Sequence, residues 1–525
     1  MSYRSLLICA VSLAAALSLS ISGSSLWTDE AFSAWMASHE SFRSLSQTLL
    51  TGGSSDLQMA LYYIYLFLWA KLFGAGEIAL RAANIPFILL FSFALVWSSW
   101  RIFRSRVAWL AAGMLPFVWR YASEARPYMA LLAFGAVGLA SVLAFTTAES
   151  TAGAKRYPWI CLSCIFLGSL FDMLFLLLVA PMALILALAH RSRRLDPRWS
   201  YWARPLAVFA LPFGALALYF LFTFYQGVVD YNYPSPGVRQ MASVAFEIAG
   251  LSGFGPNRKL SLDFRAYAVP IALGSLAIGS GAFCAAYSAL RTRRDHTVAV
   301  LAAAACLCAV EAVALALAIG KQEDARHLAA MVPVFLSLLM ALARGPAPRA
   351  SVAALILLGG AWFAADLRAA FLPEYQKEDY RDAVHAALAL HQQIGGEIVV
   401  AGDPVAAAYY GLDVRGRAPC YPIQADCGAA FQSVHWSRKT SASNAGHWAP
   451  DYIRQWLAAQ RARGIPVEIL VPLDRARRNS GWWPVLASGQ VAARKQVHGF
   501  EIVVLKDPKP LLQPVRRTAL PATVW

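Results

Sequence analysis

Long runs of uncharged, apolar residues constrain this chain more than any other feature. The first run, residues 5–23, holds no charged side chain, and similar runs recur as far as residue 366. A helix that crosses a bilayer needs roughly 20 apolar residues. We therefore expect a polytopic bundle of about eleven membrane helices, at 5–23, 82–100, 107–120, 127–147, 158–171, 173–189, 205–225, 266–290, 297–319, 327–343 and 350–366.

The composition supports this prediction and limits the classes of partner. Of 525 residues, 58% are hydrophobic and 14% are charged, whereas a soluble protein averages about 25% charged residues. The formal net charge is +16, which in a soluble chain would suggest nucleic acid or a membrane surface. Here the basic residues gather in short loops between apolar runs, so membrane topology explains the charge and no nucleic-acid partner is needed.

The distribution of charge also predicts an orientation, because Lys and Arg collect in cytoplasmic loops. Basic loops around residues 101–106, 155–156, 191–198, 291–294 and 344–349 alternate with acidic loops around 29–30, 124, 230–263 and 323–324. We therefore expect a cytoplasmic N-terminus and external acidic loops. The first apolar run resembles a signal peptide, and the runs that follow favour a retained anchor.

Segment 57–73 is rich in Tyr and Trp, and counting it as a span would place the basic loop at 101–106 outside. We interpret it as a helix in the outer membrane interface, where such residues concentrate. The first external loop then covers about residues 24–81.

After Asp366 the composition changes. Helix-like runs (378–393 and 451–463) alternate with short β-like runs that start at Glu397, Val467 and Glu501. This alternation predicts a small α/β domain, so the chain divides into a membrane domain, 1–367, and an external C-terminal domain, 368–525. Outside the cytoplasm, Cys420 and Cys427 are able to form a disulfide; a pair of free thiols is the alternative.

Asp29 and Glu30 follow directly on the first apolar run. One interpretation is structural, with Thr28 or Asp29 as the N-cap of a loop helix that continues through Glu30. The other is catalytic: Asp29, partly desolvated at the bilayer edge, acts as a general base.

Two later external turns carry cations and carboxylates. In the first, Glu124 and Arg126 flank the start of a span at Pro127; they are either a capping ion pair, or Arg126 binds a lipid phosphate while Glu124 orients it. In the second, Lys321, Arg326 and His327 precede a late span, either as snorkelling interfacial groups or as cations that neutralise a leaving phosphate. Asp172, Arg81 and Asp56 are weaker candidates. No metal-ligand spacing, nucleotide-binding glycine loop or nucleophile elbow occurs in the sequence.

The order of these pieces resembles the membrane-embedded C-type (GT-C) glycosyltransferases, the group of protein mannosyltransferases and lipid A aminoarabinose transferases. The resemblance covers roughly the first 340 residues, and it is one of pattern and not of identity. The matching pieces are Asp29-Glu30, Leu61-Tyr62-Tyr63, Leu72-Phe73-Gly74 with Glu77, Ala79-Leu80-Arg81, Glu124-Ala125-Arg126-Pro127-Tyr128 and Arg326-His327-Leu328.

The resemblance implies a polyprenyl-phosphate sugar donor, an external acceptor (a glycan, a lipid or a protein), inversion at the anomeric carbon and a bacterial inner-membrane location. It implies Asp29 as base with Glu30 beside it, Arg126, Arg326, His327 and Lys321 at the donor phosphate, and Glu124, Arg81, Tyr128 and Tyr62 in support. No cofactor is expected, and a divalent cation is not required. Where relatives carry Pro-Pro, sometimes after Lys, this chain has Asp56-Leu-Gln-Met-Ala, and where many have Arg-Tyr it has Arg326-His327.

Two other classes stay open. A transporter or flippase needs polar groups near mid-membrane and often repeated halves; Glu311, midway along its apolar run, fits that class. A non-catalytic anchor for the C-terminal domain has no use for acids in the first loop. The enzyme hypothesis requires carboxylates of the first loop to converge with guanidinium groups of the later turns.

Overall fold

The computed structural model describes most of the helical part and pieces of the C-terminal part. The described residues are 2–51, 58–148, 151–193, 200–227, 244–251, 271–276, 296–319, 325–342, 349–372, 379–394, 397–400, 404–411, 467–472, 491–497 and 500–505, together with the single residues 254, 269 and 279. The predicted span at 266–290, the predicted helix at 451–463, Lys321, Cys420 and Cys427 fall largely or wholly outside these ranges.

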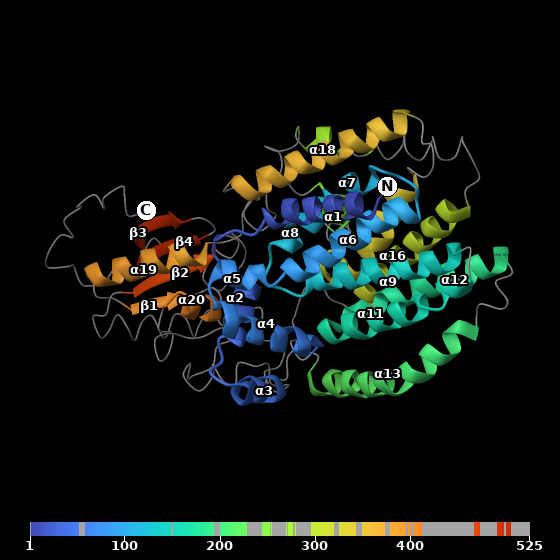
Figure 1. Ribbon diagram of the computed structural model, residues 1–525. Coiled ribbons are helices and arrows are strands. Elements are labelled where there is room, and N and C mark those ends of the chain that lie inside the picture. The colour runs from blue at the N-terminus through green and yellow to red at the C-terminus, as the bar shows by residue number, and fades with distance from the viewer. Residues whose placement is uncertain are drawn as a thin grey trace.

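Helices make up the larger body of the molecule (Figure 1). In chain order they are α1 (Tyr3–Ser18), α2 (Thr28–Ala37), α3 (Phe42–Thr51), α4 (Ala60–Phe73), α5 (Glu77–Ala82), α6 (Ile85–Arg101), α7 (Ala108–Gly113), α8 (Pro116–Ala122), α9 (Tyr128–Thr147), α10 (Thr151–Ala154), α11 (Tyr157–Phe171), the 3₁₀ helix η2 (Met173–Leu178), α12 (Val179–Arg193), α13 (Ser200–Gly227), α16 (His296–Ile319), the 3₁₀ helix η5 (Ala325–Met331), α17 (Val332–Leu342) and α18 (Arg349–Phe371).

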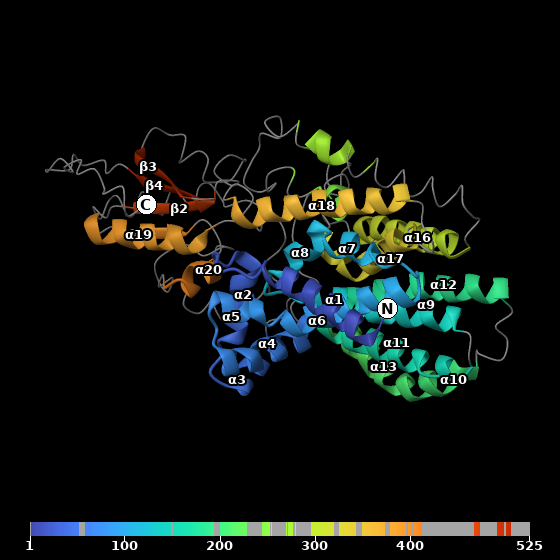
Figure 2. The ribbon, with the colours of Figure 1, turned by 45° about the horizontal axis from the view of Figure 1, so that its top comes forward.

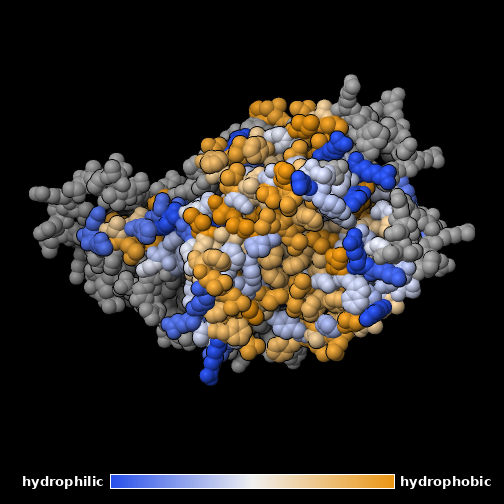
Figure 3. All heavy atoms as spheres, in the orientation of Figure 1, coloured by the Kyte–Doolittle hydropathy of each residue, from blue (hydrophilic) through white to orange (hydrophobic). Residues whose placement is uncertain are grey.

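Seven helical stretches within the described ranges are long and apolar enough to cross a membrane. They are Glu77–Arg101, Tyr128–Thr147, Met173–His190, Ser200–Thr223, His296–Ala314, Ala325–Leu342 and Val352–Phe371. Apolar side chains cover much of this body on the face shown in Figure 3, and strongly hydrophilic ones lie mostly toward its two ends. The prediction of a polytopic, mostly helical protein therefore holds.

The span-by-span prediction was less accurate. Residues 107–120 form two short helices, α7 and α8, because Pro116 disfavours helical geometry at Leu115, whose ψ is 123°. The first apolar run is helical for 16 residues, as α1. Tyr157–Phe171 is likewise too short to count among the seven stretches. The predicted number of eleven is thus not reached within the described part of the chain.

Helix α9 is the centre of the bundle and brings the site-bearing segments together. Its side chains are buried nearly throughout, and it packs against α6, α11 and η5. A Cβ added at Gly135 would lie 3.1 Å from the backbone oxygen of Ala330 in η5. The absence of a side chain at this position lets η5 approach α9 closely, and η5 carries Arg326 toward the start of α9.

Helix α4 corresponds to the segment expected in the membrane interface. It is not one of the seven spanning stretches and packs against α2, α5 and α11. Tyr62 and Tyr63 are buried on its inner side, while Leu68, Leu72 and Phe73 are exposed. One apolar side is therefore left uncovered by the protein, which fits the predicted interfacial position.

The C-terminal part contains a four-stranded mixed sheet at one end of the helical body (Figures 1 and 2). Its strands are β1 (Glu397–Val400), β2 (Val467–Pro472), β3 (Val491–Val497) and β4 (Phe500–Leu505), in the spatial order β1-β2-β4-β3. β1 and β2 are parallel, and β4 is antiparallel to both β2 and β3. The three β-like runs seen in the sequence are confirmed as strands, and β3 was missed.

Helices α19 (Tyr380–Ile394) and α20 (Pro404–Tyr409) accompany the sheet. Tyr380, Ala383, Val384 and Ala387 are buried at the spacing of one helix face, and the ring of Tyr380 lies 4.6 Å from that of Phe500 in β4. α20 packs against α2. The boundary predicted near residue 367 stays a prediction, but the C-terminal helices reach the segment that carries Asp29.

Candidate active site

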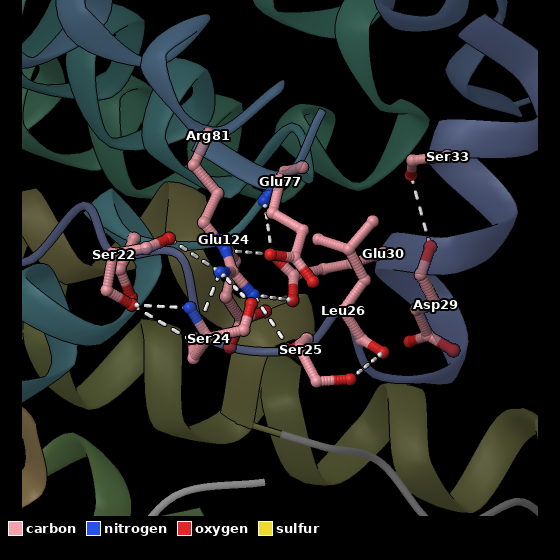
Figure 4. Close-up of polar contacts among 12 residues, drawn as sticks. Ser22, Ser24, Ser25, Leu26, Asp29, Glu30, Ser33, Glu77, Arg81 and Glu124 are labelled. Carbon is pink, nitrogen blue, oxygen red and sulfur yellow. Dashed lines mark hydrogen bonds and ion pairs between the residues drawn. The ribbon is translucent and has the colours of Figure 1, made fainter. Parts of the chain in front are cut away.

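Asp29 and Glu30 lie in the first turn of α2. The N-cap is Trp27, in extended conformation and without a side-chain cap bond, so the expectation that Thr28 or Asp29 caps this helix was wrong. Acidic residues in the first turn complement the positive end of the helix dipole. Successive residues of a helix point about 100° apart, which directs the two carboxylates into different surroundings (Figure 4).

Glu30 forms a closed, fully buried ion pair with Arg81 of α5. The Arg81 Nε donates to Glu30 Oε1 at 2.9 Å and Nη2 to Oε2 at 2.7 Å, and each residue is at most 3% exposed. Glu30 Oε1 also accepts from the backbone N–H of Ala125 at 2.8 Å. Both oxygens of Glu30 are therefore engaged, and its carboxylate ties α2 to the turn before α9.

The remaining donors of Arg81 hold the extended segment between α1 and α2. Nη1 donates to the carbonyl oxygens of Ser22 at 2.8 Å and Ser24 at 2.6 Å, and Nη2 donates to that of Ser25 at 3.1 Å. Together with the two bonds to Glu30, all five N–H groups of the guanidinium are used. Arg81 was expected only in a supporting role, and the structure makes it the buried anchor of this region.

Asp29 faces a more open environment. Its Oδ2 pairs with Nη1 of Arg326 from η5, and the two side chains are 25% and 18% exposed. The Arg326 guanidinium also lies over the ring of Trp27, 5.2 Å from its centroid. The structure thus brings the first-loop acid and the late-turn arginine into direct contact, although 297 positions separate them along the chain.

Arg126 contacts Asp29 at its backbone. It is 7% exposed, and its Nη1 donates to the hydroxyl of Tyr63 at 3.1 Å and to the carbonyl oxygen of Asp29 at 3.4 Å. Nη1 also lies 3.4 Å from the Ser33 hydroxyl. Two guanidinium groups from separate turns therefore meet at Asp29, as the enzyme hypothesis requires.

The turn that carries Arg126 is held in place by Asn84. This residue is 1% exposed, and its Nδ2 donates to the carbonyl oxygens of Ala122 at 3.1 Å and Glu124 at 2.6 Å. Sequence reasoning missed Asn84 and Ser33, and it named Tyr63 only as part of the Leu61-Tyr62-Tyr63 piece, without a role in the site. A lone Asn at the start of an apolar helix was the available signal for Asn84, since a buried amide needs partners.

Glu124 contributes to a second ion-pair group beside this turn. It is 4% exposed, and its Oε1 lies 3.5 Å from Nε of Arg120, which is one helical turn earlier in the chain. Arg120 also pairs with Glu247 at 3.0 Å, and the Tyr121 hydroxyl donates to Glu247 at 2.9 Å. This group fixes the end of α8 next to the site.

His327, Tyr128 and Tyr62 lie around the two arginines. Tyr128 is within electrostatic reach of Arg326, Arg126, Asp29 and Asp172, and Tyr62 is within reach of Arg126 and Glu30. Both tyrosines are buried. Of the ten expected site residues, Lys321 alone falls outside the described part of the chain, and the other nine surround one region.

Asp172 belongs to the same region. It caps η2 by accepting from the backbone N–H of Leu174 at 2.9 Å. Burial raises the pKa of its carboxyl, and the Leu174 N–H together with the charges of His327 and Arg126 acts in the opposite direction. In the described ranges, no three His, Cys, Asp or Glu side chains come together as a metal site.

Two solved structures share this fold. The chain aligns with the crystal structure of ArnT from Cupriavidus metallidurans bound to undecaprenyl phosphate at a TM-score of 0.51 and 13% identity, over 98% of this chain and 100% of that one. With apo ArnT the TM-score is 0.53 and the identity 14%, over 96% and 97% of the two chains. No protein-family model and no curated protein sequence matches this chain. At 13–14% identity the comparison shows a shared fold, and the predicted GT-C resemblance is confirmed at that level.

Proposed function

We propose that this chain is a glycosyltransferase that moves one sugar from a polyprenyl-phosphate carrier to an external acceptor. The observation that carries the proposal is the convergence of Asp29, Arg326 and Arg126 within a GT-C fold. The neighbour ArnT has been solved with undecaprenyl phosphate, a ligand of the proposed donor class.

In the proposed reaction, Asp29 is the general base. Its carboxylate takes the proton of the acceptor hydroxyl while the acceptor oxygen attacks the anomeric carbon. The bond between that carbon and the phosphate oxygen breaks, the phosphate leaves with the electron pair, and the anomeric configuration inverts. A positioned base of this kind contributes about 10²–10⁴-fold to a rate. The partial exposure of Asp29 gives an acceptor access to it.

Arg326 and Arg126 are the proposed phosphate-binding groups. A guanidinium matches phosphate geometry through parallel N–H bonds, and cations aimed at the leaving group stabilise the charge that develops there. Arg326 is paired with Asp29; we propose that it turns to the donor phosphate when the donor binds and so frees the base. His327 and Lys321 are retained as supporting cations, and no cofactor is part of the mechanism.

Glu30 receives a different role from the one expected. Because Arg81 and the Ala125 N–H engage both of its oxygens, we propose that Glu30 positions Asp29 and does not touch the acceptor. Tyr62, Tyr128 and Glu124 shape the same region. The external orientation, a bacterial inner-membrane location and the class of acceptor (glycan, lipid or protein) belong to the proposal.

The test compares cells that express the wild-type chain, Asp29→Asn or no protein. Mass spectrometry of envelope lipids, glycans and proteins should show a species heavier by one sugar residue with the wild type, and not with Asp29→Asn at equal membrane levels. Glu40→Gln, at an exposed acid of the same loop, should retain the product. Full transfer by Asp29→Asn removes Asp29 from the mechanism.

The transport alternative rests on Glu311 in α16, whose Oε2 is buried without a hydrogen-bond partner among the described residues. A transporter moves its substrate without a new covalent bond. If cells with the chain redistribute a lipid-linked sugar across the membrane but form no new glycosylated species, transport replaces transfer.

A further inference from the structure

The extended segment between α1 and α2 is held by a second arginine, from the C-terminal part of the chain. Arg381 of α19 donates from Nη1 to the carbonyl oxygen of Gly23 at 2.9 Å, and its backbone N–H donates to the Ser25 hydroxyl at 3.1 Å. Arg81 binds the carbonyl groups on either side of Gly23. The segment therefore lies between two guanidinium groups, one from the membrane part and one from the C-terminal part.

Tyr410, which follows α20, completes this attachment. Its hydroxyl oxygen accepts from the backbone N–H of Leu26 at 2.6 Å and from the Ser25 hydroxyl at 3.3 Å. The same hydroxyl donates to Glu77 Oε1 at 2.7 Å. A phenol has one donor and two acceptor sites, so all three are in use.

Glu77 joins the two C-terminal residues to the helix that carries Arg81. Its Oε2 lies 2.8 Å from Arg381 Nη1, its Oε1 accepts from Tyr410, and its side chain is 15% exposed. Glu77 is also the first residue of α5, where a carboxylate is favoured by the helix dipole. Arg81 lies one turn further along α5 and holds Glu30 (Figure 4).

These contacts form a continuous chain from the C-terminal part to the candidate base. An irregular backbone segment needs partners for its N–H and C=O groups, and here the partners of Gly23 and Leu26 come from α19 and from the residue after α20. Three residues beyond Leu26 stands Asp29. Loss of the C-terminal partners releases one side of the segment while Arg81 still holds the other.

We propose that Arg381 and Tyr410 are positioning residues: they hold the segment before α2 so that Asp29 meets Arg326 and Arg126. The C-terminal part is then a structural element of the site, in addition to any acceptor that it binds. The proposal has two consequences. The effect on sugar transfer rests on the proposed function, whereas the effect on the order of the segment, called the mechanical consequence below, does not.

The mechanical consequence is tested by backbone hydrogen exchange of the full-length chain in lipid nanodiscs. Tyr410→Phe and Arg381→Met should each raise exchange at residues 22–31 by about tenfold, the factor that corresponds to one ordinary hydrogen bond. Exchange within α9 should stay at the wild-type rate. Tyr409→Phe is the matched control, because the neighbouring Tyr409 hydroxyl donates to the carbonyl of Ala75 at 2.8 Å and not to the segment.

Unchanged exchange at residues 22–31 in both variants overturns the proposal. A rise of equal size in α9 also overturns it, because the two residues would then support the whole fold and not the segment. Arg381→Lys, which retains the charge but not the forked geometry, should fall between the wild type and Arg381→Met.

The catalytic consequence is tested on the sugar-transfer reaction. Arg381→Met and Tyr410→Phe should lower kcat about tenfold with little change in the donor KM, because a displaced base slows the chemical step and leaves phosphate binding intact. Wild-type kcat in variants that do show faster exchange at 22–31 contradicts the positioning role. If the wild type transfers no sugar, the proposed function fails, and the exchange experiment still decides the attachment.

Discussion

Glu30 and Asp29 are neighbours in the sequence, yet they lie in two different kinds of region. The Glu30–Arg81 pair is at most 3% exposed, and its hydrogen-bonding capacity is filled by α5, the segment before α2 and the turn before α9. The Asp29–Arg326 pair is partly exposed and joins α2 to η5. A saturated buried pair organises the backbone, whereas a pair with free access can exchange its partner for a ligand. The comparison therefore separates a structural region from a chemical one.

Arg81→Met should have the largest effect on stability. Removing one partner of a buried ion pair costs about 3–5 kcal/mol because it leaves the other charge uncompensated. The carbonyl groups of Ser22, Ser24 and Ser25 lose their donors as well. Thermal unfolding in detergent should show a large drop in Tm, and the double variant with Glu30→Gln should recover part of it. A drop no larger than that of Arg326→Met would contradict the distinction between the two regions.

Arg326→Met should act in the opposite way. This ion pair is partly exposed, so it contributes less to stability than a fully buried pair does, and the Tm should fall less than in Arg81→Met. Transfer should fall about 100-fold, since donors aimed at developing charge contribute on that scale. Initial rates and Tm measured on the same preparation check both statements. Unaltered transfer would remove Arg326 from the proposed phosphate site.

Tyr63→Phe sharpens the comparison at Arg126. It removes the hydroxyl that accepts from Arg126 Nη1 and should cost about 1 kcal/mol of stability. Tyr65→Phe is the control, because it loses a similar bond, to the carbonyl of Ala83 at 2.7 Å. Both variants should lose similar stability, and Tyr63→Phe alone should weaken undecaprenyl phosphate binding, by up to about tenfold. Equal binding in the two variants would argue against a phosphate role for Arg126.

Asp172→Asn should have the smallest effect, and one that depends on pH. Burial raises the pKa of Asp172 in the folded protein, so the folded state binds its proton more tightly than the unfolded state. The stability of the wild type then falls as the pH rises from the unfolded pKa, about 4, through the folded pKa. Asn cannot ionise, so the variant does not share this loss of stability. The difference in Tm, variant minus wild type, should therefore rise with pH across that interval and then level off. A difference that is constant with pH would contradict this assignment.

The sequence was informative where local patterns determine structure. Apolar runs located most of the described helices, and β-branched runs located three of four strands. The alternation of basic and acidic turns placed Asp29, Arg126 and Arg326 at one end of the bundle, and the structure brings them together. The break at Leu115 was missed because apolar composition alone does not report the effect of Pro116.

Contacts made by the main chain could not be predicted in this way. Arg81 and Arg381 bind carbonyl groups of the segment before α2, and every residue type carries a carbonyl group. Tyr410 and Leu26 are 384 positions apart, and no periodicity links them. The contacts of Glu30 could not be foreseen for the same reason, because its bonds to Arg81 and the Ala125 N–H become visible only when three segments are placed together.

Recognition of residues 22–25 largely through their peptide groups has a consequence for sequence variation. Replacing Ser22, Gly23 or Ser24 with other small residues leaves the bound carbonyl oxygens where they are. Inserting or deleting one residue shifts every later carbonyl oxygen by one position relative to the guanidinium groups of Arg81 and Arg381. This stretch should therefore tolerate substitutions but not insertions or deletions. The number of residues between the end of α1 and Asp29 is then a better criterion for finding related chains than residue identity.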